Sequence, residues 1–308
     1  MSSDTRDLIV VGGASAAMTS AIYAVRSGMD VLVIADEYGG QINNTDVVEN
    51  YLGFKSISGP DLADRFLEHM REYDVDEEVG SPVVDIRKDG NTFEVQTGEG
   101  EVFESRAVIM ATGGSRRRLD VPGEEEFRNK GVAYCAVCDG PLYQDEEVAI
   151  IGGGYAGTEA ALYMSDIAER VHVIDFSDKM SGEDITIKQV KDADNVEFTG
   201  GAKIKEIYGD DMVEGLKYEK DGVTHDLEVT GVFVEIGTVP NSDITDLVET
   251  NDDGYVKVDE DMETGTEGLY AAGDVNDIGA QQVAVSSGQG CQAALNASDY
   301  VKEKKAED

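Results

Sequence analysis

Two stretches of the chain share one order of apolar, glycine and small residues. Residues 8–36 and 148–175 each begin with a short apolar run, continue through a glycine-rich turn and a segment of small residues, and end in a second apolar run. Apolar runs of strand length on both sides of a helical segment predict a βαβ unit. Because the first glycines of the copies, Gly12 and Gly152, are 140 residues apart, the pattern predicts an internal repeat.

Both turns fit the glycine fingerprint of dinucleotide-binding folds. The second copy has the complete G-x-G-x-x-G spacing at Gly152, Gly154 and Gly157, whereas the first has alanine at two positions, Ala14 and Ala17. This spacing allows a tight turn and a close approach of the backbone to a pyrophosphate at the start of a helix. An acidic residue follows each fingerprint after roughly 20 residues. The repeat therefore predicts an α/β protein with two Rossmann-like domains.

The remaining pattern places the second domain inside the first. We expect a helix near residues 61–72 and strands at 83–86, 92–97, 102–103 and 107–114. Crossovers at 113–123 and 239–241 enclose the second copy, whose last strand is expected at 234–237. A strand at 268–274 and a helix at 280–300 follow, and residues 302–308 are expected to fray. We therefore expect one domain of residues 1–115 and 243–308, and an inserted domain of residues 117–242.

Charge adds information on the surface and on partners. The chain has 64 acidic and 25 basic residues, a formal charge of −39, yet 41% of its residues are apolar. That apolar content can build cores, so we expect a folded protein with acids on its surface, and such a surface repels nucleic acid and anionic lipid. A halophilic cytoplasm would screen the repulsion among the acids.

The same sequence predicts a cytoplasmic protein without a membrane segment. No apolar run approaches the roughly 18 residues of a bilayer-spanning helix. The polar first seven residues lead directly into the apolar run at 8–11, without the basic and apolar regions of a signal peptide.

Three cysteines are too few for a disulfide scaffold, but two of them form a C-x-x-C pair, Cys135 and Cys138. A zinc site would need further Cys or His residues at ligand spacing, and the three histidines are scattered, so we expect no metal. Redox chemistry is favoured because this spacing brings two sulfurs within disulfide reach. The adjacent Asp139 is either an acid–base group for a thiolate or an ordinary turn residue.

Taken in order, the motifs resemble those of the low-molecular-weight thioredoxin reductases over nearly the whole chain, with residues 48–54 closest to archaeal members. The seven motifs are residues 12–17, Gly39-Gly40-Gln41, Val48-Glu49-Asn50, residues 135–140, residues 152–157, Gly273-Asp274-Val275 and Gly288-Gln289-Gly290-Cys291.

The resemblance implies FAD on the first domain. It also implies that Cys138 faces the flavin, that Cys135 attacks the thioredoxin disulfide, that Asp139 is the acid–base residue, and that Cys291 is a packing thiol. The residues expected to hold FAD are Gly12, Gly13, Ala14, Ser15, Ala16, Ala17, Asp36, Glu37, Gly40, Gln41, Asn50, Thr112, Gly113, Asp274, Val275, Gln281, Gln282 and Val283.

Two departures from the family pattern concern the electron donor. A nicotinamide site would use Gly152, Gly154, Tyr155, Ala156, Gly157 and Asp175. Family members that use NADPH have a His-Arg-Arg run after the second strand of this domain, whereas residues 174–180 here contain Lys179 as their one basic residue. Asp175 suits a free ribose hydroxyl and repels a 2′-phosphate. The late helix opens with Gln281-Gln282 instead of the usual Arg-Gln. We therefore expect no use of NADPH and at best weak use of NADH.

Three functions fit these residues. The first is a thioredoxin-disulfide reductase that passes electrons from FAD through Cys135 and Cys138 to thioredoxin. The second is a flavin-dependent dithiol oxidase that uses oxygen, for which an aromatic pocket near the cysteines, with Tyr134 and Tyr143 as candidates, would be evidence. The third is a redox sensor without catalysis. Ferredoxin or another small carrier is an expected donor.

A basic cluster at residues 116–118 either docks that carrier or offsets neighbouring acids. The resemblance also implies a homodimer.

Overall fold

The computed structural model describes residues 5–44, 48 and 50–307, without the side chains of Asn44, Val137 and Cys138. It divides into two compact units, which are described separately: unit 1 comprises residues 1–115 and 239–308, and unit 2 residues 116–238. The mixed α/β fold with two Rossmann-like domains, one inserted in the other, is confirmed.

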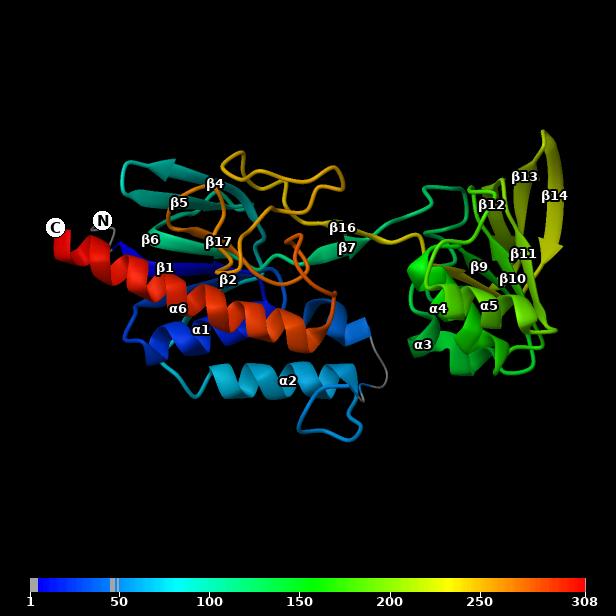
Figure 1. Ribbon diagram of the computed structural model, residues 1–308, viewed down its shortest axis with the longest axis horizontal. Helices are drawn as coiled ribbons and strands as arrows, with labels where there is room; N and C mark the ends of the chain where they lie inside the picture. The colour runs from blue at the N-terminus through cyan, green and yellow to red at the C-terminus, as the bar shows by residue number, and fades with distance from the viewer. Residues whose placement is uncertain (1–4, 45–47, 49, 308) are drawn as a thin grey trace. The chain divides into compact units, whose positions relative to one another are not determined.

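Unit 1 contains a seven-stranded sheet with the order β3-β2-β1-β6-β5-β4, and β17 pairs with β6 off this path (Figure 1). Strands β1, β2, β3, β6 and β17 are parallel, and β4 and β5 are antiparallel additions. Its elements are β1 (Arg6–Val11), α1 (Ser15–Arg26), β2 (Val31–Ala35), η1 (Gly40–Asn44), α2 (Gly59–Met70), β3 (Asp76–Val79), β4 (Val83–Asp89), β5 (Thr92–Thr97), β6 (Val102–Met110), β17 (Leu269–Ala271) and α6 (Val283–Glu307).

Unit 2 contains a five-stranded parallel sheet with the order β11-β10-β9-β15-β8 and a three-stranded antiparallel sheet, β12-β13-β14. Its elements are β8 (Val132–Ala133), α3 (Ala136–Asp139), η2 (Gly140–Tyr143), β9 (Glu147–Ile151), α4 (Tyr155–Ser165), β10 (Arg170–Ile174), α5 (Asp184–Asp192), β11 (Val196–Thr199), β12 (Ala202–Gly209), β13 (Val213–Lys220), β14 (Val223–Glu228) and β15 (Gly231–Val234). Where the chain passes between the units, β7 (Gly114–Arg116) and β16 (Thr238–Pro240) form a two-stranded sheet.

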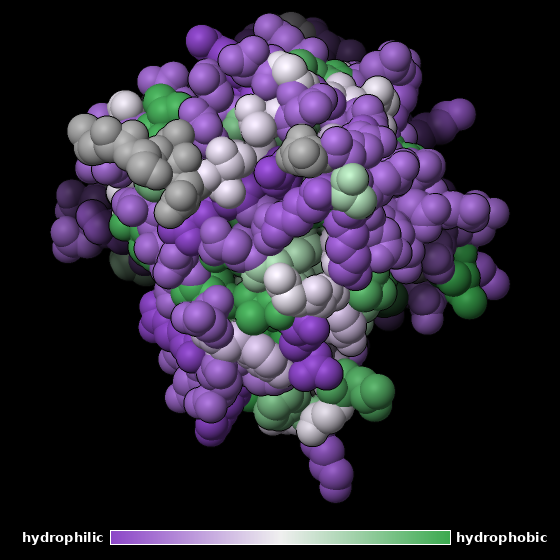
Figure 2. Space-filling model, turned by 90° about the vertical axis from the view of Figure 1, so that its left-hand side faces the viewer, coloured by the Kyte–Doolittle hydropathy of each residue, from purple (hydrophilic) through white to green (hydrophobic). Residues whose placement is uncertain are grey.

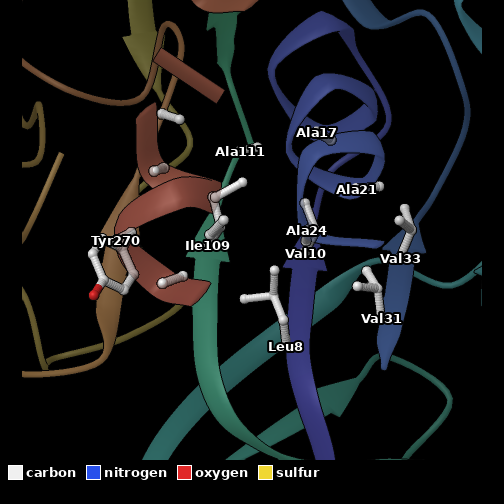
Figure 3. Packing of buried hydrophobic residues seen from close by; sticks show 14 of the residues in the cluster. Leu8, Val10, Ala17, Ala21, Ala24, Val31, Val33, Ile109, Ala111 and Tyr270 are labelled. Carbon is white, nitrogen blue, oxygen red and sulfur yellow. The ribbon is translucent and has the colours of Figure 1, made fainter. Parts of the chain in front are cut away.

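The core of unit 1 lies where α1 and α6 cover one face of the sheet. Leu8 and Val10 of β1 pack with Ala17 and Ala21 of α1 (Figure 3), and all four are fully buried. Small residues on the helices permit this close packing. A Cβ placed on Gly290 of α6 would lie 2.2 Å from a backbone oxygen of α1. The small-residue pattern of the sequence therefore sets the spacing of the two helices.

Three predicted elements are corrected. The strands expected at 102–103 and 107–114 are one strand, β6, whose first half pairs with β5 and whose last half pairs with β17, so that its polar middle marks a change of neighbour and not a break. The last strand of unit 2 ends at Val234 instead of residue 237. Residues 302–307 are helical instead of frayed, because Lys305 pairs with buried Asp7 at 2.6 Å and Lys304 with Glu267 at 3.1 Å.

Hydrophilic residues dominate the face of the molecule shown in Figure 2. Within the described part of the chain, no helix has the length and apolarity needed to cross a bilayer, and no group of three or more His, Cys, Asp or Glu side chains is arranged to hold a metal ion.

The net charge of −39 predicts a strong dependence of stability on salt. Repulsion among the acids is larger in the compact native state than in the unfolded chain, and salt screens it. We expect the melting temperature to rise by roughly 10 °C or more between low and molar KCl. Thermal unfolding followed by circular dichroism measures this, and a melting temperature that does not change with KCl would contradict the halophilic interpretation.

Candidate functional site

The glycine turn of unit 1 leaves the N-terminus of α1 without a side-chain cap. The helix begins after Ala14, whose side chain makes no capping hydrogen bond, and its first turn contains no acidic residue. Gly12 has φ +131°, and a Cβ there would lie 2.1 Å from the oxygen of Ala111. The first backbone N–H groups of α1 are therefore available to an anion.

Residues from distant segments that the sequence assigned to one site lie close to one another near this turn. Asn50 Nδ2 donates to Gln282 Oε1 at 3.0 Å, and Gln41 Nε2 donates to the oxygen of Gly114 at 3.1 Å. A Cβ on Gly40 would lie 3.3 Å from the Cβ of Ala14, and one on Gly273 would lie 3.1 Å from the Cβ of Ala16. Three other predicted members also have hydrogen-bond partners within unit 1. Thr112 Oγ1 donates to the backbone oxygen of Asn241 at 2.7 Å, Ser15 Oγ donates to that of Val283 at 3.5 Å, and Gln281 Nε2 donates to the hydroxyl of Tyr255 at 3.0 Å.

Asp274 brings a carboxylate to the same end of the sheet. It follows β17 and accepts a hydrogen bond from Ser286 Oγ of α6 at 3.0 Å. Burial raises the pKa of Asp274, and the bond from Ser286 partly opposes that shift. Gln289 and Asn276 form a buried polar group behind it, with Gln289 Oε1 accepting from the Gly273 N–H at 2.8 Å.

Three predicted cofactor residues lie differently from the rest. The side chains of Asp36 and Glu37 are exposed after the end of β2, and the backbone oxygen of Glu37 faces Gly13, where a Cβ would meet it at 2.2 Å. The side chain of Val275 is fully buried in a hydrophobic cluster with Val11 and Met110. Val275 can therefore present only backbone groups to a ligand.

The cysteine pair lies in unit 2, at the start of α3. Cys135 follows β8 and is disulfide-bonded, whereas Cys291 of α6 is a free thiol. The side chain of Cys138 lies outside the described residues, as does Glu49 of the Val48-Glu49-Asn50 motif. Asp139 ends α3, and its N–H donates to the Cys135 oxygen at 3.1 Å.

Glu235 is a neighbour of this segment that the sequence did not reveal. It follows β15, its side chain is 12% exposed, and its Oε1 accepts the N–H of Ala136 at 3.1 Å. Burial raises the pKa of Glu235 from 4.5 to about 7, against the opposing effects of Arg116 and the Ala136 N–H. The available signal was a glutamate at the end of the apolar run 231–234. The contact itself was not predictable, because Ala136 and Glu235 are 99 positions apart in the sequence.

In the glycine turn of unit 2, the carboxylate of Asp175 accepts a backbone N–H group of the turn. The buried Asp175 accepts the N–H of Gly153 through Oδ2 and the N–H of Ser177 through Oδ1, both at 2.5 Å. The turn itself is tight, since a Cβ on Gly157 would lie 1.9 Å from the oxygen of Gly152. The helix that follows, α4, begins after Gly154 without a side-chain cap, and its first residue, Tyr155, is 65% exposed. Asp175 thus places negative charge against the turn that was predicted to receive a pyrophosphate.

The basic cluster at 116–118 is paired within unit 2. Arg118 contacts Glu125 at 2.6 Å, Arg116 Nη1 lies 3.9 Å from Glu235 Oε2, and Arg117 Nε donates to the oxygen of Thr238 at 3.3 Å. These contacts favour the interpretation in which the arginines offset neighbouring acids.

The two tyrosines near the cysteine pair also have partners. Tyr134 donates to Glu124 at 2.8 Å, and the ring of Tyr143 packs edge-on against Phe233, with ring centroids 5.2 Å apart.

The whole arrangement matches one family. Residues 6–290 match the model of the pyridine nucleotide-disulphide oxidoreductases. The chain belongs to this family. Membership implies FAD as the cofactor. It also supports the interpretation that the protein is a flavin oxidoreductase that acts on a disulfide.

Individual relatives agree with this assignment. The chain is 39% identical over 298 residues to the F component of the alkyl hydroperoxide reductase of Staphylococcus aureus, which covers 96% of this chain and 59% of that protein. The chain therefore spans about three fifths of the length of this curated relative. Among solved structures, the thioredoxin reductase of Lactococcus lactis gives a TM-score of 0.80 at 32% identity, covering 97% of this chain and 100% of that one. A ferredoxin-flavin thioredoxin reductase of Clostridium acetobutylicum gives 0.56 at 30% identity, with 98% and 99% covered.

The residues of unit 1 fit FAD. A dinucleotide pyrophosphate needs donors without internal partners, and the uncapped start of α1 offers its first N–H groups. No Cβ occupies Gly12 or Gly13, where one would meet backbone oxygens at 2.1 and 2.2 Å. The carboxylate of Asp274, whose pKa burial raises, lies beside this turn and can accept a hydroxyl hydrogen bond.

Proposed function

We propose that the protein is a thioredoxin-disulfide reductase that passes electrons from FAD through Cys135 and Cys138 to thioredoxin. The observation that carries this proposal is the disulfide at Cys135, placed at the start of α3 in a nucleotide-binding fold. The structural similarity to thioredoxin reductases supports thioredoxin as the partner.

The chemistry of the two cysteines is thiol–disulfide exchange. In the reduced protein the Cys135 thiolate attacks one sulfur of the thioredoxin disulfide, forming a mixed disulfide and releasing the other sulfur as a thiolate. Cys138 then attacks the Cys135 sulfur, which restores the Cys135–Cys138 disulfide and releases thioredoxin as a dithiol. Asp139 would hold the proton that the leaving thiolate requires. When bound, FAD supplies the two electrons that reduce the cysteine pair again.

The residues of unit 1 would hold the cofactor through different groups. The first N–H groups of α1 would bind the pyrophosphate, and Asp274 would bind a ribityl hydroxyl. Gln41, Asn50 and Gln282 would line the flavin side. Each role follows from the placement described above and remains a proposal.

Turnover of thioredoxin tests the proposed function directly. The FAD-loaded protein, reduced with one equivalent of dithionite under anaerobic conditions, should convert oxidised thioredoxin to its dithiol, detected by alkylation and mass spectrometry. Oxygen consumption driven by a small dithiol, without reduction of thioredoxin, would instead identify a dithiol oxidase. The packing of Tyr134 and Tyr143 within unit 2 gives that second function no specific support.

The electron donor gives a further prediction. A 2′-phosphate carries about −1.5 to −2 charges and would meet Asp175 and Asp178. At ~5 Å and an effective dielectric of ~20, each repulsion is about 3 kcal/mol before screening, or roughly a hundredfold in affinity. We expect negligible reduction by NADPH at any salt concentration and weak reduction by NADH. An anaerobic titration followed by flavin absorbance measures this, and efficient turnover with micromolar NADPH would contradict it.

A small electron carrier of the ferredoxin class is the donor that we propose. The similarity to a ferredoxin-flavin thioredoxin reductase supports it. In the same titration, reduced ferredoxin should bleach the flavin where NADPH does not. The homodimer implied by the resemblance stays a prediction, which light scattering after gel filtration can check.

A further inference from the structure

Glu235 contacts the peptide group that joins Cys135 to Ala136. Its Oε1 lies 3.1 Å from the Ala136 nitrogen, so the carboxylate accepts the N–H at the very start of α3. This N–H belongs to the group of donors that normally stabilises a thiolate on the first cysteine of such a helix. The contact lies entirely within unit 2.

The surroundings of Glu235 allow its charge to act strongly on neighbouring groups. Its side chain is only 12% exposed, and a carboxylate in such a place is poorly screened by water. Arg116 Nη1 is 3.9 Å from Oε2, beyond the length of a good charge-assisted hydrogen bond. Among the described residues, Arg116 from β7 is the charged group that acts on the pKa of Glu235, and it lowers it. The other contact of the carboxylate is the peptide N–H of Ala136, next to Cys135.

We propose that Glu235 is a positioning residue for the Cys135 thiol: it fixes the peptide group beside Cys135, and its protonation state sets how readily that thiol ionises. This inference rests on the proposed redox role of Cys135. An ionised Glu235 disfavours a thiolate at Cys135 through like-charge repulsion and by occupying the Ala136 N–H. A thiolate at Cys135 in turn favours a protonated Glu235.

The coupling gives Glu235 a place in the redox cycle. Two-electron reduction of the cysteine disulfide creates two sulfur anions. Glu235 would take up a proton from solvent as Cys135 becomes a thiolate, and would release it when the disulfide forms again. Burial raises the pKa of Glu235 to about 7, so this exchange would occur close to neutral pH.

The test is the reactivity of Cys135 as a function of pH. We would use FAD-bound protein with Cys138→Ser, reduced and freed of reductant, in constant molar KCl from pH 5 to 10. Iodoacetamide alkylation is quantified by peptide mapping. Glu235→Gln keeps an oxygen for the Ala136 N–H but removes the charge, so the pKa of Cys135 should fall by about one unit. At pH values where Cys135 is mainly protonated in both the variant and its parent, Cys135 of the variant should then react roughly tenfold faster.

The shape of the pH profile distinguishes this role from simple packing. Below about pH 6 Glu235 is neutral, so the Gln variant and its parent should react at the same rate, and their ratio should rise through pH 7. Glu235→Asp keeps the charge and should stay close to the parent. Glu124→Gln is the matched control, because Glu124 is another buried glutamate of unit 2 that accepts two backbone N–H groups. Cys291 in the same sample is the internal reference thiol.

Two results would overturn the proposal: a Cys135 profile that is identical in the Gln variant and the parent, or a shift of equal size in Glu124→Gln or at Cys291. Should Glu235→Gln fail to fold, the parent protein decides the matter. The proposal requires an inflection near pH 7 in its Cys135 profile, beside that of the thiol itself, and a profile without this inflection would overturn it. The measurement contains no thioredoxin. Failure of thioredoxin turnover would therefore reject the proposed function and leave this inference standing.

Discussion

Cys135→Ser is expected to lower thioredoxin reduction by more than about a thousandfold, because a serine hydroxyl is almost entirely protonated at neutral pH and cannot replace a thiolate in disulfide exchange. Cys138→Ser should be equally inactive in turnover but chemically different. It retains the attacking sulfur and lacks the one that resolves the mixed disulfide, so it should accumulate a covalent complex with thioredoxin. Non-reducing electrophoresis and mass spectrometry of the trapped complex measure this.

The third cysteine is the matched control. Cys291 is a free thiol of α6 that hydrogen-bonds the hydroxyl of Tyr23, a contact that raises the pKa of Tyr23. Cys291→Ser should therefore retain full turnover. If Cys135→Ser trapped the complex and Cys138→Ser were inactive without trapping one, the attacking and resolving roles would be reversed. If Cys291→Ser were the inactive variant, the proposed redox pair would be wrong.

Gly12→Ala is expected to yield protein without bound FAD. The added Cβ would lie 2.1 Å from the oxygen of Ala111, and the φ of +131° is unfavourable for any residue with a Cβ. Relief requires the turn before α1 to move away from the neighbouring strand, at a cost of at least about 3 kcal/mol. The N–H groups proposed for the pyrophosphate move with it. The measurement is the ratio of flavin absorbance to protein after desalting.

Gly152→Ala is the counterpart in unit 2. Its φ is +119°, and its Cβ would lie 2.2 Å from the oxygen of Glu235, so the local strain is similar. Because we place FAD on unit 1, Gly152→Ala should keep its flavin. Loss of flavin from Gly152→Ala and retention by Gly12→Ala would assign the cofactor to the other unit. Circular dichroism of both proteins separates loss of flavin from loss of fold.

The local parts of the fold were predictable from the sequence, because their causes are local. Glycine spacing and apolar runs specify each βαβ unit within about 30 residues. The C-x-x-C spacing by itself brings the two sulfurs within the distance of a disulfide. The extension of α6 was missed because its charged last turn is held by Asp7, which is 298 residues away from Lys305. β6 was divided in two because its polar middle records a change of pairing partner, which only the assembled sheet contains.

The candidate site shows the same division. The residues that form turns were identified by their type, whereas Glu235, Asn241 and Ser286 were missed, because an isolated polar residue after an apolar run has no distinguishing local pattern. Asp175 was identified, and its sequence position suggested a ribose ligand. In the structure its carboxylate accepts two backbone N–H groups of its own unit. The sequence therefore predicted where the carboxylate of Asp175 lies. It could not predict these hydrogen bonds, because they form only in the folded turn.

The order of the units along the chain has a consequence for biosynthesis. All of unit 2 is translated before β17 and α6, the last elements of unit 1, leave the ribosome. Domains fold as units during synthesis, so unit 2 can complete its fold while unit 1 still lacks the strand that pairs with the end of β6 and the helix that packs on α1. For that interval unit 1 presents an unpaired strand edge and an uncovered small-residue helix face. Unit 1 of the nascent chain thus stays exposed to misassociation even after unit 2 has folded.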